Sequence, residues 1–278
     1  MHLKLTIIFV LFCTLQIQAN SLQKIWETDT LFAKPESAIY DSVNQCVYIS
    51  NINGKYLEKD GNGFISKIDL KGNISKLEWI KGFDNPQGMG ISKGNLYIAD
   101  IDKVIQVDIR LGKIVKEYKV TGSAFLNDVT SDEEGNIFIS ECKNNKVFKL
   151  TNNEVTVWLN DTILKSPNGL LSQGNVLYLL NQKNGFVFEV NKKDKSISKF
   201  LEGIKNCDGI TPDGEGGFFI SGAWQGQIYH INSNGDKKLV LDLGNEKTIT
   251  ADITYIPKIK MLIIPTLYKT VLAYKWIK

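Results

Sequence analysis

The sequence repeats itself at an interval of about forty residues, and this repeat limits the possible folds more than any other feature. Six segments share one pattern: a polar residue, a small or polar residue, an apolar pair, a turn and an apolar strand. The segments begin at Glu36, Gln87, Asn127, Asn168, Asp208 and Ala251. Successive starts are 51, 40, 41, 40 and 43 residues apart. Period-two alternation with Gly, Asn and Asp turns continues between them, without a long helical stripe. A period of about 40–45 residues with four strands each is typical of a propeller blade.

The two ends of the chain indicate how the ring closes. Only 27 residues follow Ala251, which is enough for three strands but not for four. Residues 23–28 resemble residues 75–79, which we expect to form the fourth strand of an earlier repeat. The N-terminal strand would then complete the last blade and hide its free edge. We therefore predict an all-β fold, a six-bladed β-propeller with four-stranded blades, as a single domain over residues 20–278.

Within each repeat, a turn and an apolar strand follow the opening segment. These second strands are expected at residues 46–50, 96–99, 137–140, 177–180, 218–221 and 261–264. The first interval is about ten residues longer than the others, and the excess, residues 55–64, should form a loop between the second and third strands of its blade. Residues 58–69 superficially match an EF-hand calcium loop, with Glu first and Asp last and with no helical flanks. A turn-rich surface loop is the favoured interpretation, and a second calcium site is the alternative.

The first nineteen residues have the composition of a targeting segment. Residues 1–4 carry one positive charge, residues 5–17 are almost wholly apolar, and Ala19 offers a small residue for cleavage before Asn20. This order is typical of a secretory signal peptide, and the apolar stretch is too short for a membrane span, which needs about 20 residues. We predict a signal peptide at 1–19 and an exported protein, periplasmic or secreted. A lipid anchor at Cys13 is the alternative, although the bulky Phe12 precedes that cysteine.

Composition excludes several classes of function. The formal net charge is only +3 and Arg110 is the sole arginine, so the usual residue for reading phosphates and base edges is nearly absent and nucleic acid is not expected as a partner. Beyond the signal peptide three cysteines remain, at positions 46, 142 and 207, which is not a disulfide framework. His230 is the only histidine there, which excludes a His/Cys zinc cluster and argues against a Ser-His-Asp triad. The number of subunits stays open.

The first residues of the inner strands should meet at one mouth of the central channel, because all inner strands run in the same direction. Four of these six positions carry the oxygen donors that we assign to a cation, two carboxylates and two amides: Glu36, Asn127, Asn168 and Asp208. Buried polar groups cost several kcal/mol unless they are satisfied, and one divalent cation would satisfy all four. A donor set made only of oxygen suits calcium ahead of magnesium or manganese. In the alternative interpretation, these side chains only solvate a wet channel mouth.

The opening segments of the repeats resemble the blade openings of the senescence marker protein/gluconolactonase family, the regucalcin-like propellers. The paraoxonases and strictosidine synthase are more distant relatives of that family. The resemblance spans essentially residues 20–278. Its marks are the openings Pro35-Glu36-Ser37, Leu126-Asn127-Asp128-Val129, Pro167-Asn168-Gly169-Leu170 and Cys207-Asp208-Gly209-Ile210. The resemblance implies one divalent cation on the axis, with Glu36, Asn127, Asn168 and Asp208 as its ligands. Calcium is the expected ion, with zinc, magnesium and manganese as alternatives.

The family resemblance also implies an activity, the hydrolysis of sugar lactones or related esters. The cation would polarise the carbonyl and acidify water, and Asp208 would be the general base. The ends of the second strands form an outer ring at the same mouth, where Asp100, Glu141 and Asn181 are expected to contact substrate. Trp224 is a candidate for stacking on a sugar face, with simple packing as the alternative.

One position departs from the family pattern. Gluconolactonase-like members usually have an arginine two residues before the Asn-Asp pair, where it holds the sugar acid, and this chain has Phe125. A more apolar lactone or ester therefore becomes a candidate substrate, and Phe125 is expected to contact it. The histidines used by paraoxonases are missing as well. Two further classes stay open: a non-catalytic propeller that keeps the metal and binds a small ligand or a protein partner, and a scaffold that binds nothing at the axis.

Overall fold

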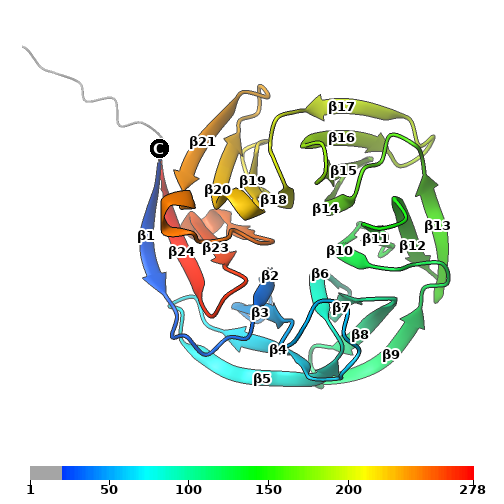
Figure 1. Ribbon diagram of the computed structural model, residues 1–278, viewed down its shortest axis with the longest axis horizontal. Coiled ribbons are helices and arrows are strands. Elements are labelled where there is room, and N and C mark those ends of the chain that lie inside the picture. The colour runs from blue at the N-terminus through cyan, green and yellow to red at the C-terminus, as the bar shows by residue number, and fades with distance from the viewer. Residues whose placement is uncertain (1–20) are drawn as a thin grey trace, which may run out of the picture.

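Six four-stranded antiparallel sheets form a closed ring around a central axis in the computed structural model, which describes residues 21–278 (Figure 1). The fold prediction is confirmed. The predicted signal peptide at residues 1–19 lies outside the described residues. Among residues 21–278, no helix has the length and apolar character needed to span a membrane.

The first three blades follow the chain order from the axis outwards. Blade 1 contains β2 (Pro35–Asp41), β3 (Cys46–Asn51), β4 (Gly63–Ile68) and β5 (Ile74–Phe83). Blade 2 contains β6 (Pro86–Ser92), β7 (Asn95–Asp100), β8 (Lys103–Asp108) and β9 (Lys113–Lys119). Blade 3 contains β10 (Leu126–Ser131), β11 (Ile137–Glu141), β12 (Lys146–Thr151) and β13 (Glu154–Asn160).

The last three blades include the closure of the ring. Blade 4 contains β14 (Pro167–Gln173), β15 (Val176–Asn181), β16 (Phe186–Asn191) and β17 (Ile197–Leu201). Blade 5 contains β18 (Cys207–Pro212), β19 (Phe218–Gly222), β20 (Gln227–Ile231) and β21 (Lys237–Asp242). Blade 6 contains β22 (Thr254–Ile256), β23 (Met261–Pro265), β24 (Val271–Ile277) and β1 (Ser21–Glu27). The short 3-10 helices are η1 (Ala223–Gln225), η2 (Gly244–Glu246) and η3 (Pro257–Ile259).

The N-terminal strand closes the ring as predicted, because β1 pairs antiparallel with β24 from Ser21↔Ile277 to Glu27↔Leu272. Each second strand lies within one residue of its predicted bounds. The sixth inner strand is shorter than expected from the segment at Ala251, since β22 begins only at Thr254. Asp252, two residues earlier, forms backbone hydrogen bonds with blade 1 instead. Its N–H donates to the Glu36 carbonyl, and its carbonyl accepts from the Ala38 N–H.

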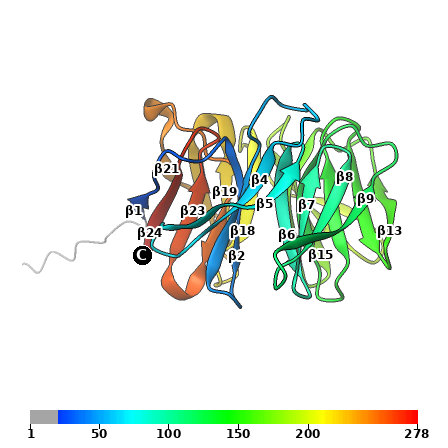
Figure 2. The same ribbon diagram turned by 90° about the horizontal axis from the view of Figure 1, so that it is seen from below.

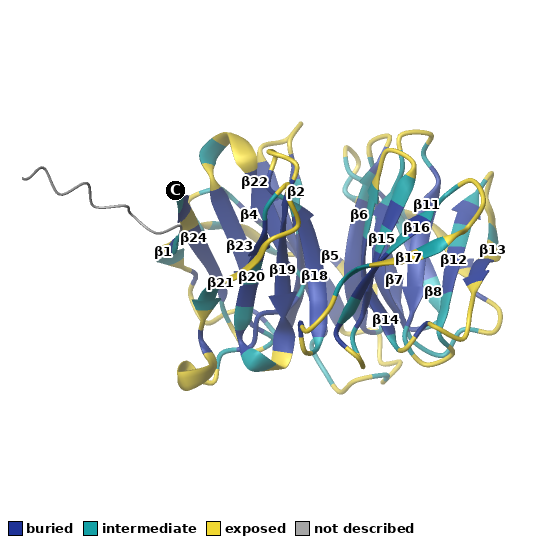
Figure 3. Ribbon diagram, turned by 90° about the horizontal axis from the view of Figure 1, so that it is seen from above, coloured by how far each residue is buried: buried dark blue, intermediate teal, exposed yellow. Residues whose placement is uncertain are grey.

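Burial follows the position of a strand within its blade. Every residue of β3 is buried, whereas the outer strand β9 exposes five of its seven residues. Figure 3 shows the strands largely buried and the exposed residues concentrated in the connecting loops. Inner and middle strands pack between neighbouring blades, so they are buried nearly throughout, while most residues of the outer strands are exposed or half-buried. The apolar clusters span neighbouring blades; in one of them, Tyr48 and Ile65 of blade 1 lie with Leu96 and Ile98 of blade 2.

One face of the ring carries two kinds of loop. They are the loops between the second and third strands and the loops that lead into each inner strand. The long loop of blade 1, residues 52–62, is one of these and rises above the blade edges (Figure 2). The EF-hand-like stretch at residues 58–69 has no helical flank, and its second half is the strand β4. Because successive side chains of a strand point to opposite faces, this half cannot wrap around an ion. The structure agrees with the favoured interpretation of a surface loop.

Candidate functional site at the channel mouth

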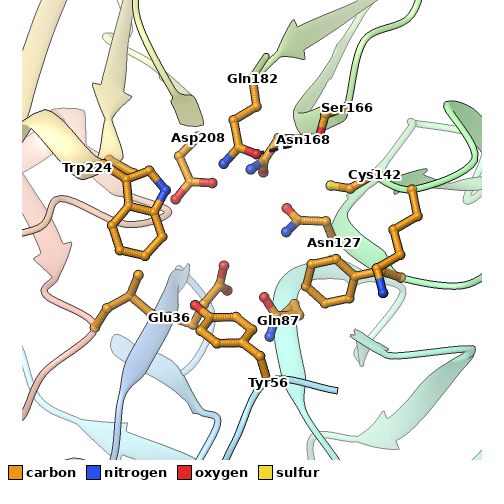
Figure 4. Close-up of a pocket in the computed structure, with 14 residues that line it drawn as sticks. Glu36, Tyr56, Gln87, Asn127, Cys142, Ser166, Asn168, Gln182, Asp208 and Trp224 are labelled. Atoms are coloured by element: carbon orange, nitrogen blue, oxygen red, sulfur yellow. Dashed lines mark hydrogen bonds between the residues drawn. The ribbon is translucent and has the colours of Figure 1, made fainter.

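A repeated irregularity turns the predicted site residues toward the axis. In five blades, the first residue of the inner strand pairs with the last residue of the second strand, and pairing resumes three residues later. The two residues between are unpaired in the manner of a β-bulge, a device that redirects side chains. The first of each pair points into the channel mouth, which brings together Glu36, Gln87, Asn127, Asn168 and Asp208 (Figure 4).

Serines of the second strands hold several of these bulges. The hydroxyls of Ser50, Ser140 and Ser221 accept hydrogen bonds of 2.8–2.9 Å from the N–H groups that follow Glu36, Asn127 and Asp208. These backbone groups have no partner across the strand pair, so the serines satisfy donors that would otherwise be buried alone. The geometry of the site is therefore supported by residues that do not line it.

The site is a pocket of about 280 Å³ at the axis. The four predicted cation ligands belong to its lining, together with the predicted substrate residues Phe125 and Trp224. The rest of the lining was not singled out from the sequence as site residues: Tyr56, Gln87, Cys142, Lys143, Ser166, Gln182, Ala223 and Leu267. Tyr56 comes from the long loop of blade 1, whose extra length was visible in the repeat spacing. The other rim residues carried no signal that separates them from ordinary turn residues.

The pocket floor contains two buried carboxyl groups, and one of them lacks a hydrogen-bond partner. Glu36 is 4% exposed, and its Oε2 atom has no hydrogen-bond partner. Burial raises the pKa of Glu36 well above its ordinary range, and the charges of Asp208, Asp252 and Asp128 raise it further. Burial and Asp252 raise the pKa of Asp208 to about 7, against a lowering by a hydrogen bond from Asn168. Cationic charge at this floor would lower both pKa values, because an opposite charge favours the ionised form.

The donor chemistry of the floor fits a hard cation. Glu36 and Asp208 supply carboxylate oxygens, Asn127 and Asn168 supply amide groups, and Glu36 Oε2 is an acceptor without a donor. Within residues 21–278, no group of three or more His, Cys, Asp or Glu side chains is arranged to hold a metal ion. A cation here would thus depend on the two amides as much as on the two carboxylates. Such oxygen-rich sets are the ligands that calcium prefers.

A second layer of carboxylates lies deeper in the channel, one position after the first layer along the chain. Asp128 accepts hydrogen bonds of 2.6 Å from the N–H groups of Val129 and Leu170. Asp252 accepts one of 2.5 Å from the Ser37 hydroxyl. Burial raises the pKa values of both groups, that of Asp252 to about 7. Neighbouring carboxylates raise the pKa of Asp128 further. These two residues were part of the repeat pattern, but the pattern did not indicate that their carboxyl groups would lie close enough to raise the pKa of Glu36.

Three residues predicted to contact substrate lie outside the pocket. Asp100, Glu141 and Asn181 are fully buried at the ends of their strands. Glu141 accepts hydrogen bonds from the N–H groups of Ala124, Phe125 and Asn144. Asp100 likewise accepts from Asp84 and Asn85, and Asn181 from Lys165. Their side chains fold back onto the loops that lead into the inner strands, so in this structure they anchor those loops.

The remaining reactive side chains do not offer a nucleophile. Cys46, Cys142 and Cys207 are free thiols, and of these only Cys142 lines the pocket. The Cys142 thiol donates to the Pro167 carbonyl at 3.0 Å, and burial raises its pKa, which keeps it protonated. His230 lies inside blade 5, where Nε2 is 2.9 Å from Asp213 Oδ2.

Comparisons with known proteins place the chain among six-bladed propellers. No family model matches it, and no curated protein matches it either. A gluconolactonase from Xanthomonas campestris superposes with a TM-score of 0.71 and 12% identity, over 89% of this chain and 88% of the other. A catalytically inactive histidine-to-alanine variant of virginiamycin B lyase from Staphylococcus aureus, with quinupristin, superposes with a TM-score of 0.66 and 16% identity, over 93% of this chain and 100% of the other. A streptogramin B lyase superposes with a TM-score of 0.67 and 12% identity, over 93% of this chain and 97% of the other.

These neighbours share the fold. The gluconolactonase among them matches the family that the blade openings resemble. At such identities the likeness carries the architecture alone, because one propeller scaffold supports many chemistries.

Proposed function

We propose that this protein is a hydrolase of lactones or related esters that depends on one divalent cation, with calcium as the expected ion. The observation that carries the proposal is the pocket floor, where four oxygen-donor side chains from four blades converge around the unpartnered Glu36 Oε2. Glu36, Asn127, Asn168 and Asp208 would hold the cation. When bound, it would polarise the ester carbonyl and lower the pKa of water.

In this proposal Asp208 moves the proton. Its carboxylate would accept a proton from the water that attacks the carbonyl carbon, and would return it to the ring oxygen when the C–O bond breaks. The product is the open hydroxy acid. A hydrogen bond from Asn168 orients Asp208 for this task. Tyr56, Phe125 and Trp224 line the walls and would exclude bulk water from the reacting atoms, which strengthens the electrostatic interactions there.

The pocket favours a hydrolase over the lyase chemistry named for two structural neighbours. Replacement of one histidine by alanine made the Staphylococcus aureus lyase inactive. His230, the only histidine among residues 21–278, is bound to Asp213 within blade 5 and does not line the pocket. We further propose that the protein acts outside the cytoplasm, on the strength of residues 1–19.

The test is a hydrolysis screen of metal-stripped protein, residues 20–278, refilled separately with calcium, magnesium, manganese or zinc. A panel of sugar lactones, alkyl lactones and aryl esters is assayed by proton release. Asp208→Asn should abolish turnover while the circular dichroism spectrum is kept. Asp194→Asn is the matched control, because Asp194 is an exposed residue between the third and fourth strands of blade 4, on the opposite face.

Two results would contradict the proposal. Unchanged turnover in Asp208→Asn would remove the proposed base. Cation binding without hydrolysis of any lactone or ester would favour the non-catalytic propeller that binds a ligand or protein partner at the same mouth.

A further inference from the structure

The axial pocket is polar at its floor but apolar along much of its wall. Phe125 stands where the related family uses an arginine, and its ring meets that of Tyr56 edge-on, with centroids 6.5 Å apart and planes at 83°. Trp224 and Leu267 belong to the same lining, and Trp224 is 56% exposed. A wall of this kind contacts hydrocarbon more favourably than the hydroxyls of a sugar, because apolar area is removed from water.

A second cavity of about 510 Å³ adjoins this wall. It is a groove formed by three loops on the mouth face: the loop between β1 and β2, the start of the long loop of blade 1, and the loop between β23 and β24. Its lining residues are Phe32, Ala33, Lys34, Asn53, Gly54, Leu267, Tyr268 and Lys269. Leu267 lines both the groove and the axial pocket, so the two cavities adjoin at this side chain.

Backbone hydrogen bonds hold the groove in shape. The N–H groups of Phe32 and Lys34 donate to the carbonyls of Lys269 and Tyr268 at 3.2 and 3.0 Å. The N–H of Leu267 donates to Pro35 at 2.9 Å, directly before the site residue Glu36. A preformed groove binds a ligand without first having to order its own loops, which removes part of the entropic cost of binding.

Two lysines belong to the groove lining, Lys34 and Lys269. The ammonium of Lys34 bonds to the Gly54 carbonyl and lies 6.0 Å from the centroid of the Tyr56 ring. Lys269 is exposed, so its ammonium can stay in water while its apolar stem borders the groove. This arrangement leaves the groove open to a hydrocarbon chain.

We propose that the groove is a subsite for a hydrocarbon substituent of the substrate, so that the enzyme acts on lactones that carry an alkyl chain. The lactone ring lies over the floor at Glu36 and Asp208, and the chain crosses Leu267 into the groove beside Phe32 and Tyr268. This inference rests on the proposed function, since it names the substrate class of the same site.

The test measures binding separately from hydrolysis. Calcium-loaded protein is titrated calorimetrically with two non-hydrolysable γ-lactams, one carrying a methyl group and the other an octyl chain. Each buried methylene tightens binding roughly fourfold, so partial burial of the chain should give at least about a tenfold preference for the octyl lactam. Leu267→Asn should reduce that preference to about threefold or less.

A matched variant controls for the unusual backbone. Leu267 has a left-handed conformation with φ of 58°, and Leu57 has one with φ of 66° but lines neither cavity. Asparagine tolerates this region, so Leu57→Asn repeats the same change away from the groove and should keep the preference. Ala33→Phe, which fills the groove without reaching the axial pocket, should abolish it.

The outcomes separate the subsite from the activity. Equal binding of the two lactams, binding of neither, or an unchanged preference in both Leu267→Asn and Ala33→Phe would overturn the subsite. The corresponding lactones are then assayed for hydrolysis. Chain-length preference without hydrolysis would support the subsite and contradict the proposed function. Hydrolysis without chain-length preference would support the proposed function and contradict the subsite.

Discussion

Replacement of Asp208 by asparagine should change stability in opposite directions with and without the cation. In the cation-free protein, Asp208 is a buried carboxylate beside Asp252, and its pKa is raised from 3.8 to about 7. A raised pKa in the folded state lowers stability progressively as the pH rises from the ordinary pKa to the raised one, because the carboxyl group ionises more readily in the unfolded chain. Neutralisation by the amide removes this effect.

The size of the effect follows from the pKa. A shift of about three units at 1.36 kcal/mol each gives about 4 kcal/mol as the maximum gain at pH 8. Screening by water in the channel reduces this to roughly 2–4 kcal/mol, which corresponds to a rise in Tm of roughly 5–10 °C. With calcium at about a hundredfold excess over its Kd, the wild type gains about 2.7 kcal/mol. The variant has lost a ligand and should gain much less.

Thermal unfolding of the wild type and Asp208→Asn at pH 8, in EDTA and in calcium, measures both effects. The variant should melt higher than the wild type in EDTA, and calcium should narrow or reverse that order. In EDTA at pH 4, close to the ordinary pKa of 3.8, the advantage of the variant should largely disappear. A variant that melts lower than the wild type in EDTA, or that gains as much from calcium, would refute the electrostatic reasoning.

Three other substitutions probe the parts that support the site. Glu141→Ala removes the buried acceptor of three backbone N–H groups around Phe125 and should lower the free energy of unfolding by about 3 kcal/mol in urea titrations; a loss below about 1 kcal/mol would show that the loop does not depend on this anchor. Gly169→Ala places a Cβ 1.9 Å from the Asp208 carbonyl oxygen, so it should abolish the calcium-dependent rise in Tm, and normal calcium binding would be the contrary result. His230→Gln should lower Tm by a few degrees through its lost contact with Asp213 and leave kcat/KM unchanged, whereas a large loss of turnover would place the histidine in the reaction.

The spacing of the repeat was sufficient to predict the blades and the ring closure. A blade needs four strands and a fixed number of turn residues, so the period reports the architecture directly. The residue that opens each repeat recurs at the same place in the first five blades, which is why the pattern predicted Glu36, Asn127, Asn168 and Asp208 at one channel mouth. The structure then placed all four in one pocket lining.

The direction of a side chain at the rim could not be predicted in the same way. Asp100, Glu141 and Asn181 occupy the strand ends expected of them, yet they turn back to bind the loops that precede the inner strands. The repeat pattern does not show which backbone N–H groups of those loops need an acceptor. Only the folded path of the backbone shows this. Tyr56 and Leu267 were missed for the same reason, since they enter the pocket from loops whose course the spacing does not define.

Calorimetric titration of metal-stripped protein with calcium shows directly whether the axial pocket binds a cation. We expect one saturable site per chain, with binding lost or strongly weakened in Glu36→Gln and kept in the surface control Asp194→Asn. The absence of binding heat with calcium, magnesium, manganese and zinc alike, or a single site that Glu36→Gln leaves unchanged, would contradict this prediction.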